Sequence, residues 1–262
     1  MTVTCLEETC NSNFDDFTFI SPLSGPHSAL FLKRGTDERI YCFKSVHDHV
    51  SSHLPERNIF LKGLRSPFLV GLHHCFLQED RLDICMEYCA GGSLYDVIKV
   101  KKQKLSNTDI WLIITQLVHG LAFLHENGII HRDVKPSNVF LCSEERPLRV
   151  KLGDFSICID LNDSPVYDFC GTPLFMAPEV LQGGCYDTAV DMWSLGVLIY
   201  FLVHGSYPFE SFLETLTAEI PTSDSEFSHL ISRLLVRDPT ERATAEELLR
   251  YPKIAETYDR HF

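Results

Sequence analysis

The chain has 262 residues, of which 45% are hydrophobic and 23% are charged. This composition is that of a globular protein with enough apolar side chains for a sizeable core in one or two domains. The formal net charge of −13 disfavours non-specific binding to nucleic acid and to anionic membranes, so neither is expected as a partner.

The cysteine content indicates the compartment. The ten cysteines include no C-x-x-C pair, and the first ten residues contain no apolar secretory leader. We therefore expect reduced thiols in an intracellular protein, cytoplasmic or nuclear or both. The longest apolar run, residues 192–203, is too short to span a bilayer and predicts a buried helix.

The first third of the chain is predicted to be rich in strands. Residues 1–16 are polar and acidic, and they predict a flexible tail. Gly35 separates two of the apolar runs that follow and predicts a hairpin. Pro55 predicts the first turn of a helix over residues 55–64. The runs that predict strands are residues 17–23, 29–34, 39–46 and 68–77.

The remainder of the chain is predicted to be helical. Residues 106–128 begin with the capping residue Ser106, keep apolar residues at helical spacing and stop at Gly128. Strands followed by helices predict an α+β protein in two lobes. We expect lobes over residues 17–88 and 89–262. The other predicted helices are residues 188–204, 225–236 and 244–251.

Three short motifs occur in order in the second lobe. The stretch HRDVKPSNVF covers residues 131–140, DFS begins at Asp154, and APE covers residues 177–179; Lys44 closes the earlier stretch YCFK. One three-letter match carries little information, but the ordered set with these spacings is specific. Over residues 17–256 the chain resembles a eukaryotic protein kinase domain of the serine/threonine type. It has features of the NIMA-related and calcium/calmodulin-kinase-like groups.

The resemblance implies a fold and a catalytic set. The fold is the two-lobed α+β protein kinase fold, with a small, mostly β first lobe and a larger, mostly α second lobe. The cofactors are ATP and Mg²⁺. Asp133 would accept the proton of the substrate hydroxyl, Lys135 would contact the γ-phosphate, and Lys44 would hold the α- and β-phosphates. Asn138 and Asp154 would be the Mg²⁺ ligands.

The resemblance also implies a nucleotide pocket. Met86 falls at the gatekeeper position, and the main chain of Glu87 and Cys89 would read the adenine edge. Glu56 would be the counter-charge of Lys44, although counting back from Pro67 places the usual glutamate position at Arg57. The other expected nucleotide contacts are Gly25, Leu30, Cys42 and Phe140.

Two positions depart from the family pattern. The loop that covers the phosphates keeps only Gly25, with Ser28 where another glycine is expected, although glycine lets the backbone approach the phosphates closely. Ser156 replaces the glycine of the metal-binding turn. It predicts a stiffer turn that still binds metal.

Several further residues are expected in structural or regulatory roles. Glu179 and Arg242 would form a buried ion pair, Asp191 would cap the catalytic loop, and the hydroxyl of Thr172 would reach the catalytic aspartate and lysine. In the family, the arginine of the catalytic loop, here Arg132, often pairs with a phosphorylated residue. The position of that phosphorylated residue is occupied by Asp168 in this chain. Asp168 is either a fixed negative charge that replaces the phosphate or a solvated loop acid.

The expected activity is transfer of the γ-phosphate of Mg·ATP to serine or threonine hydroxyls of protein substrates. The alternative is a pseudokinase, a binding or scaffold module with little phosphotransfer, which the degenerate glycine loop and Ser156 keep open. Kinases that require an arginine before the acceptor residue usually carry acidic side chains at the positions held here by Ser93 and Ser137. Both side chains are uncharged here, so a requirement for arginine in the substrate is not expected.

Overall fold

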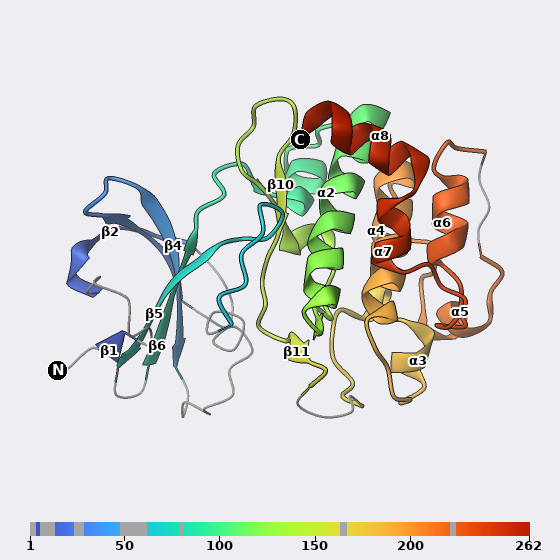
Figure 1. The fold of residues 1–262 in the computed structure, drawn as a ribbon, viewed down its shortest axis with the longest axis horizontal. Coiled ribbons are helices and arrows are strands. Elements are labelled where there is room, and N and C mark those ends of the chain that lie inside the picture. Colours follow the sequence, from blue (N-terminus) through green and yellow to red (C-terminus); the bar gives the residue numbers. More distant parts are fainter. Residues whose placement is uncertain are drawn as a thin grey trace. The chain divides into compact units, whose positions relative to one another are not determined.

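The computed structural model describes residues 4–5, 14–23, 29–47, 62–78, 81–162, 167–220 and 224–262. The chain forms two compact units, coloured along the sequence in Figure 1. Unit 1 is Met1–Ala90 together with Asp154–Ser156, and unit 2 is Gly91–Gly153 together with Ile157–Phe262. The α+β composition and the order of strands before helices, both predicted from the sequence, are confirmed.

Unit 1 is built on one antiparallel six-stranded sheet, in the order β1-β5-β6-β4-β3-β2 (Figure 1). β1 lies within the stretch that was predicted to be a tail, and it pairs with β5. A short 3₁₀ turn, Phe14–Asp16, precedes β2. The strands are β1 Thr4–Cys5, β2 Phe17–Leu23, β3 Ala29–Gly35, β4 Ile40–His47, β5 Leu72–Gln78 and β6 Arg81–Glu87.

The turn between β3 and β4 is the hairpin predicted at Gly35. Gly35 N donates to Arg39 O at 2.9 Å, and Glu38 takes a φ of 65°. The side chain of Asp37 stabilises the turn, because its carboxylate accepts hydrogen bonds from Arg39 N at 3.1 Å and from the Tyr41 hydroxyl at 2.6 Å. Short acidic side chains commonly stabilise turns by such local bonds.

One face of the sheet carries an aromatic core. Phe43 is fully buried. Its ring centroid lies 6.2 Å from that of Phe76 and 5.6 Å from that of Phe31, both in stacked arrangements. The ring of Phe17 meets it edge-on, with the centroids 5.1 Å apart. The four rings come one each from β2, β3, β4 and β5, and they meet because their side chains lie on the same face of the sheet. Aromatic pairs of this kind add about 0.5–1.5 kcal/mol beyond burial.

Unit 2 is mostly helical. Its two long helices, α2 (Asn107–Glu126) and α4 (Ala189–His204), run side by side (Figure 1). Ser106 and Asp109 form a capping box at the start of α2, as the capping signal predicted. The shorter elements are η2 Asp96–Val100, α3 Pro178–Leu181, α5 Phe212–Thr217, α6 Ser228–Leu234, α7 Ala245–Leu249 and α8 Pro252–His261.

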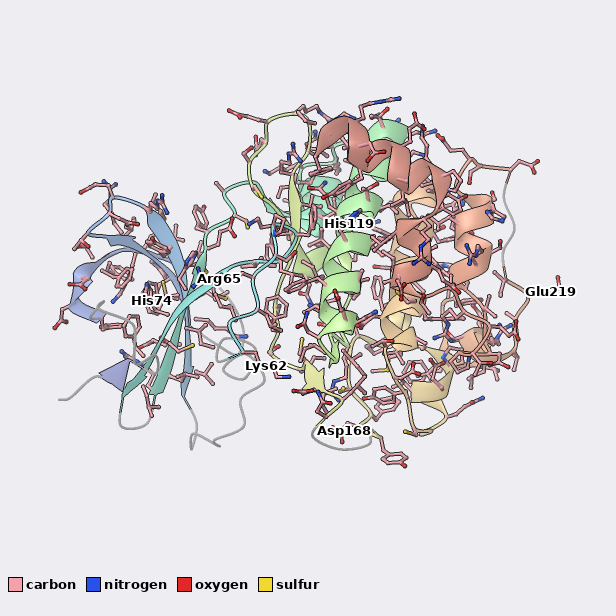
Figure 2. The ribbon with its side chains drawn as sticks, viewed as in Figure 1. Lys62, Arg65, His74, His119, Asp168 and Glu219 are labelled. Atoms are coloured by element: carbon pink, nitrogen blue, oxygen red, sulfur yellow. The ribbon has the colours of Figure 1, made fainter. Side chains whose placement is uncertain are left out.

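Two of the predicted helices are shorter than expected. Residues 225–236 and 244–251 were predicted, but α6 and α7 keep only their central turns. The helix α8 was not predicted; it packs on α2, where His119 stacks on Tyr258 at 4.1 Å (His119 is labelled in Figure 2). The helix expected over residues 55–64 lies mostly outside the described residues. Among the described residues, no helix has the length and apolar content that a membrane crossing requires.

Short strands and turns of unit 2 carry the polar motifs. β7 (Gly92–Ser93), β9 (Val139–Leu141) and β10 (Val150–Leu152) form one small sheet, in the order β10-β9-β7. A second consists of β8 (Ile129–Ile130) and β11 (Ile159–Asp160). The loop from β8 runs through the 3₁₀ turn η3 (Pro136–Asn138) into β9, and a second 3₁₀ turn, η4 (Pro173–Phe175), precedes α3.

We predict that Gly196→Ala destabilises unit 2. Alanine is favoured over glycine inside a helix by about 1 kcal/mol. However, a Cβ atom at Gly196 would lie 2.8 Å from Leu234 Cβ and 2.9 Å from Leu235 Cδ2, where α4 packs on α6. Overpacking of this kind costs about 1–3 kcal/mol, so a net loss is expected. Urea unfolding measures it, with the exposed substitution Ser232→Ala as the control. A variant more stable than the wild type would contradict the packing.

Candidate active site

The loop between β8 and η3 is held by one buried carboxylate. Asp191, in the first turn of α4, is fully buried and accepts hydrogen bonds from the main-chain amides of His131 and Arg132, both at 2.8 Å. His125 Nε2 lies 2.9 Å from the same carboxylate. Burial alone would raise the pKa of Asp191, but these hydrogen bonds and neighbouring charges outweigh it, so its pKa lies below the ordinary value. Asp191 therefore caps this loop, as predicted.

Asp133 is the centre of a compact polar network. Its Oδ1 accepts the Thr172 hydroxyl at 2.6 Å, and its Oδ2 lies 2.6 Å from Lys135 Nζ and 2.8 Å from Asn138 Nδ2. Lys135 also donates to the Thr172 hydroxyl at 2.7 Å. Four residues from two segments, residues 133–138 and Thr172, thus meet within hydrogen-bonding distance. A carboxylate oriented in this way can accept a proton from a hydroxyl group placed against it.

Lys44 and Asp154 meet within unit 1. Lys44 lies on β4, and its Nζ is 3.3 Å from Asp154 Oδ1. The Asp154 side chain is 38% exposed, so its carboxylate is accessible to solvent. Asp154 takes a φ of 60°, whereas Ser156 does not have a positive φ. The backbone conformation that favours glycine is therefore carried by Asp154, and a serine at position 156 is not strained here.

The two expected metal ligands belong to different units, Asn138 to unit 2 and Asp154 to unit 1, and each carries oxygen atoms of the kind that Mg²⁺ prefers. Asn138 Nδ2 donates both to Asp133 O at 2.9 Å and to Asp133 Oδ2, which turns the amide oxygen of Asn138 away from Asp133. Asp154 supplies carboxylate oxygens. Mg²⁺ prefers a few hard oxygen ligands of this kind, completed by phosphate oxygens and water.

The expected nucleotide contacts of unit 1 lie on three neighbouring strands. Leu30 on β3 pairs with Lys44 on β4, and Cys42 pairs with Met86 on β6. Burial raises the pKa of the Cys42 thiol to about 11, although Lys44 opposes the shift, so the thiol is neutral at physiological pH. Phe140 belongs to unit 2, where it lies on β9 between Ser93 and Lys151.

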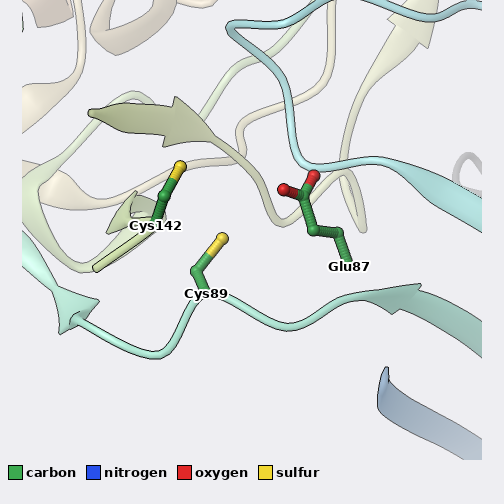
Figure 3. A group of neighbouring side chains, drawn as sticks. All are labelled: Glu87, Cys89 and Cys142. Carbon is green, nitrogen blue, oxygen red and sulfur yellow. The ribbon is translucent and has the colours of Figure 1, made fainter. Parts of the chain in front are cut away.

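Glu87 is the last residue of β6, and Cys89 lies two residues further along the chain (Figure 3). Glu87 is tied to Gly71 twice: its amide donates to Gly71 O at 2.8 Å, and its Oε2 accepts from Gly71 N at 3.1 Å. These bonds fix the main chain at the point where it leaves the sheet. Gly25, Glu56 and the alternative Arg57 lie outside the described residues.

The predicted ion pair of Glu179 and Arg242 is present in unit 2. Arg242 Nη1 and Nη2 donate to the two carboxylate oxygens of Glu179 at 2.7 Å and 3.0 Å. Arg242 also donates to Ala189 O at 2.7 Å and to Val236 O at 2.9 Å, and its side chain is fully buried. This paired geometry satisfies the buried charge and joins α3 to the start of α4.

Arg132 contacts Asp168, which is labelled in Figure 2. The distance from Nη1 to Oδ2 is 3.4 Å, with the Asp168 side chain 73% exposed and the Arg132 side chain 9% exposed. Tyr186 joins the two, because its hydroxyl accepts from Arg132 Nη1 at 3.1 Å and donates to Asp168 O at 2.9 Å.

The sequence analysis did not identify three residues that belong to these hydrogen-bond networks: His125, Tyr186 and Gly71. His125 lies in the last turn of α2, six residues before His131, and its position gave a weak signal. Tyr186 and Gly71 act through partners distant in the sequence. Nothing in the local sequence around either residue marks it.

Comparison with known proteins gives a consistent result. The sequence profile of the family described as protein kinase domain matches residues 28–254. Protein kinase C-like 2 of Schizosaccharomyces pombe is 30% identical, over 91% of this chain and 26% of its own. A probable myosin light chain kinase of Dictyostelium discoideum is 30% identical, over 95% of this chain and 69% of its own. Serine/threonine-protein kinase 17A of Oryctolagus cuniculus is 32% identical, over 73% of this chain and 52% of its own.

The matched regions cover unequal shares of these relatives. The chain spans about a quarter of the first relative and about half of the third. The myosin light chain kinase agrees with the calcium/calmodulin-kinase-like features seen in the sequence. The NIMA-related features stay a prediction.

We predict that Asp191 stabilises the fold at neutral pH and loses this effect in acid. Its pKa is lowered from 3.8 on folding, so the unfolded chain binds the proton more readily. The stabilisation is therefore complete when the pH is above the pKa of Asp191 in the unfolded chain. It disappears as the pH falls through the lower pKa of Asp191 in the folded chain. Asp191→Asn should cost about 3 kcal/mol at neutral pH, because the amide cannot satisfy the same donors.

Urea unfolding followed by circular dichroism tests this expectation. The gap in unfolding free energy between the wild type and Asp191→Asn should narrow as the pH is lowered through about 4. The exposed substitution Asp259→Asn serves as the control and should show almost no gap. A constant gap at all pH values would contradict an ionised Asp191.

Proposed function

This chain belongs to the protein kinase domain family, and from that membership we propose that it transfers the γ-phosphate of ATP to serine or threonine hydroxyls of proteins. Protein kinases use ATP as the phosphate donor and Mg²⁺ as the metal. The names of two relatives, a probable myosin light chain kinase and serine/threonine-protein kinase 17A, agree with this class. The ten cysteines favour an intracellular protein.

The network around Asp133 is the observation that carries the proposal. A protein that only binds partners has no need to hold a carboxylate by a lysine, a threonine and an asparagine at 2.6–2.8 Å. Such a preorganised group is what proton transfer requires, because positioning and charge neutralisation supply most of the catalysis in phosphoryl transfer.

Each member of the network has a proposed task. Asp133 accepts the proton of the attacking hydroxyl. Lys135 neutralises the charge that develops on the γ-phosphate oxygens. Thr172 fixes the positions of the Asp133 and Lys135 side chains relative to each other, because its hydroxyl donates to Asp133 and accepts from Lys135. A lysine two residues after the catalytic aspartate is the family pattern for serine/threonine acceptors.

Unit 1 is proposed to hold the nucleotide. Lys44 contacts the α- and β-phosphates, and Glu56 is its proposed counter-charge. Asp154 and Asn138 would hold Mg²⁺, which would supply positive charge against the phosphate oxygens. The main chain of Glu87 and Cys89 reads the adenine edge. The remaining proposed nucleotide contacts are Gly25, Leu30, Cys42, Met86 and Phe140.

Asp133→Asn tests the activity. We expect phosphotransfer from Mg·ATP to myelin basic protein or casein to fall by about 10²–10⁴-fold, because the amide cannot accept the proton. Incorporation of labelled phosphate measures it, with Asp259→Asn as a matched control that keeps full activity. Equal signals from wild type and Asp133→Asn would identify a contaminating kinase and leave a binding module as the function.

Asp168 is proposed to act as a fixed negative charge for Arg132. The 3.4 Å contact and the shared partner Tyr186 support this role. Phosphorylated residues order such segments by giving an arginine a charge to hold, and an aspartate offers the same sign with less charge. Because Asp168 is mostly exposed, the pair is worth at most about 1 kcal/mol and weakens with salt.

We predict that Asp168→Asn lowers kcat measurably, but by no more than about fivefold, which corresponds to that free energy. Activity of the wild type should survive phosphatase treatment, since the charge is not a phosphate. Full activity of Asp168→Asn, or loss of wild-type activity on dephosphorylation, would make Asp168 a solvated loop acid.

A further inference from the structure

A buried polar cluster lies in unit 1, within the strands that carry Lys44 and its neighbours. Asp83 on β6 is fully buried, and its carboxylate accepts a hydrogen bond from the Ser45 hydroxyl on β4. Arg81 Nε donates to the same carboxylate at 2.9 Å, and Arg81 Nη2 lies 2.8 Å from it. A buried carboxylate costs free energy unless such partners compensate it. No step of the proposed phosphotransfer uses this cluster, so its presence in the sheet calls for another role.

A second cation and an aromatic ring complete the cluster. Lys33 on β3 is 6% exposed, and its Nζ lies 3.2 Å from the centroid of the Phe14 ring. Burial lowers the pKa of Lys33, and the negative charge of Asp83 opposes this shift. The Phe14 ring also lies 5.7 Å from the guanidinium carbon of Arg81 and packs edge-on against Phe43. Asp83 therefore supplies negative charge near two cations that contact the same aromatic ring.

The hydrogen-bonded pair of Asp83 and Ser45 fixes how β4 lies against β6. In the antiparallel register, Ser45 is the partner of Asp83. The next pair along the strands is Lys44 with Ile84. Successive side chains of a strand point to opposite faces, so Ser45 and Lys44 project to opposite sides of the sheet. A slip of one residue would exchange these faces and leave the buried carboxylate without the serine hydroxyl, which makes the slip costly.

The pair on the other side of Lys44 is apolar. Phe43 pairs with Cys85, and both side chains are fully buried in the aromatic core. Apolar packing has no fixed direction, so this contact tolerates small rotations of the strand. The bond from Ser45 to Asp83 requires alignment of donor and acceptor and does not tolerate them. The direction in which Lys44 leaves β4 is therefore set mainly by the hydrogen-bonded pair.

The direction of Lys44 matters because the metal-binding turn brings no cation of its own. No lysine or arginine occurs between Lys151 and Arg233, a stretch with seven aspartates and five glutamates. Asp154 lies in this stretch, and its Oδ1 is 3.3 Å from Lys44 Nζ. Lys44 thus supplies the positive charge beside this carboxylate. How well the proposed phosphate contacts form depends on where β4 places its amine.

We propose that Asp83 and Ser45 are positioning residues for Lys44, and that they set the affinity of unit 1 for the α- and β-phosphates of the nucleotide. They act through the direction of β4 and touch no nucleotide atom. The inference rests on the proposed function and deepens it, because it gives a buried cluster outside the candidate active site a task in nucleotide binding. Specifying one register over others is the best-attested use of a buried polar group.

Ser45→Ala tests this role without turnover. Isothermal titration calorimetry compares Mg·ADP, which carries both phosphates, with adenosine, which carries neither. We expect the variant to bind ADP about three- to tenfold more weakly, the factor that one net hydrogen bond corresponds to, and to bind adenosine with wild-type affinity. Asp83→Asn should weaken ADP binding at least as much, because it leaves Arg81 and Lys33 without a counter-charge. If urea unfolding shows that Asp83→Asn is not folded, Ser45→Ala decides alone.

Cys85→Ala is the matched control. Cys85 is as buried as Asp83, lies on the same face of β6 and belongs to the pair that flanks Lys44 on the other side. Its truncation should lower stability but leave the affinities for ADP and adenosine unchanged. Three results would overturn the positioning role: equal weakening of ADP and adenosine by Ser45→Ala, no weakening of either ligand, or the same selective loss of ADP affinity in Cys85→Ala.

Steady-state kinetics separate this proposal from the proposed function. Ser45→Ala should raise KM for ATP by about the same three- to tenfold factor and leave KM for myelin basic protein unchanged. If the wild type transfers no phosphate while the ADP and adenosine results hold, the kinase proposal fails and the positioning role stands. If phosphotransfer is normal and Ser45→Ala keeps the wild-type KM for ATP, the positioning role is refuted. A wild type that binds no ADP would overturn both.

Discussion

The loop that carries Asp133 is held in place by the buried carboxylate of Asp191. It accepts two successive main-chain amides, at His131 and Arg132, and contacts His125. Arg132 takes a φ of 67°, a left-handed conformation that costs a non-glycine residue about 1–2 kcal/mol. The two amide bonds to Asp191 are what offsets that cost. Because Asp133 is the next residue, its direction follows from this constraint.

The start of α4 fixes more than the loop that carries Asp133. Asp191 lies two residues after Ala189, whose carbonyl accepts from Arg242 at 2.7 Å, while Arg242 also binds Glu179 of α3 through both carboxylate oxygens. Thus one helix end fixes the loop that carries Asp133 and the segment that follows Thr172. The hydrogen bond between Thr172 and Asp133 then joins two segments that are each tied to α4.

Local patterns in the sequence predicted the elements that carry strong local signals. The strand 17–23 and the helix that follows Ser106 were found from alternation and capping alone. The motif order identified the residues that meet at Asp133, because spacing within a known pattern substitutes for tertiary information. His125, Tyr186 and Gly71 were missed because their partners are remote in sequence. The helix α8 was missed although Pro252 in its first turn is a helix-start signal. Short helices such as α6 ended early because tertiary packing overrides weak terminal propensity.

The absence of lysine and arginine between Lys151 and Arg233 reaches beyond electrostatics. Trypsin cleaves after these two residue types, so a complete digest leaves residues 152–233 as a single fragment. That fragment contains Ser156, Tyr167 and Thr172, and tryptic peptide mapping therefore cannot tell a phosphate on one of them from a phosphate on another by mass alone. A protease that cuts at aspartate or glutamate divides the same stretch many times. The stretch also offers no side-chain amine to ubiquitin or acetyl transfer, so hydroxyl and thiol groups are its nucleophiles for covalent control.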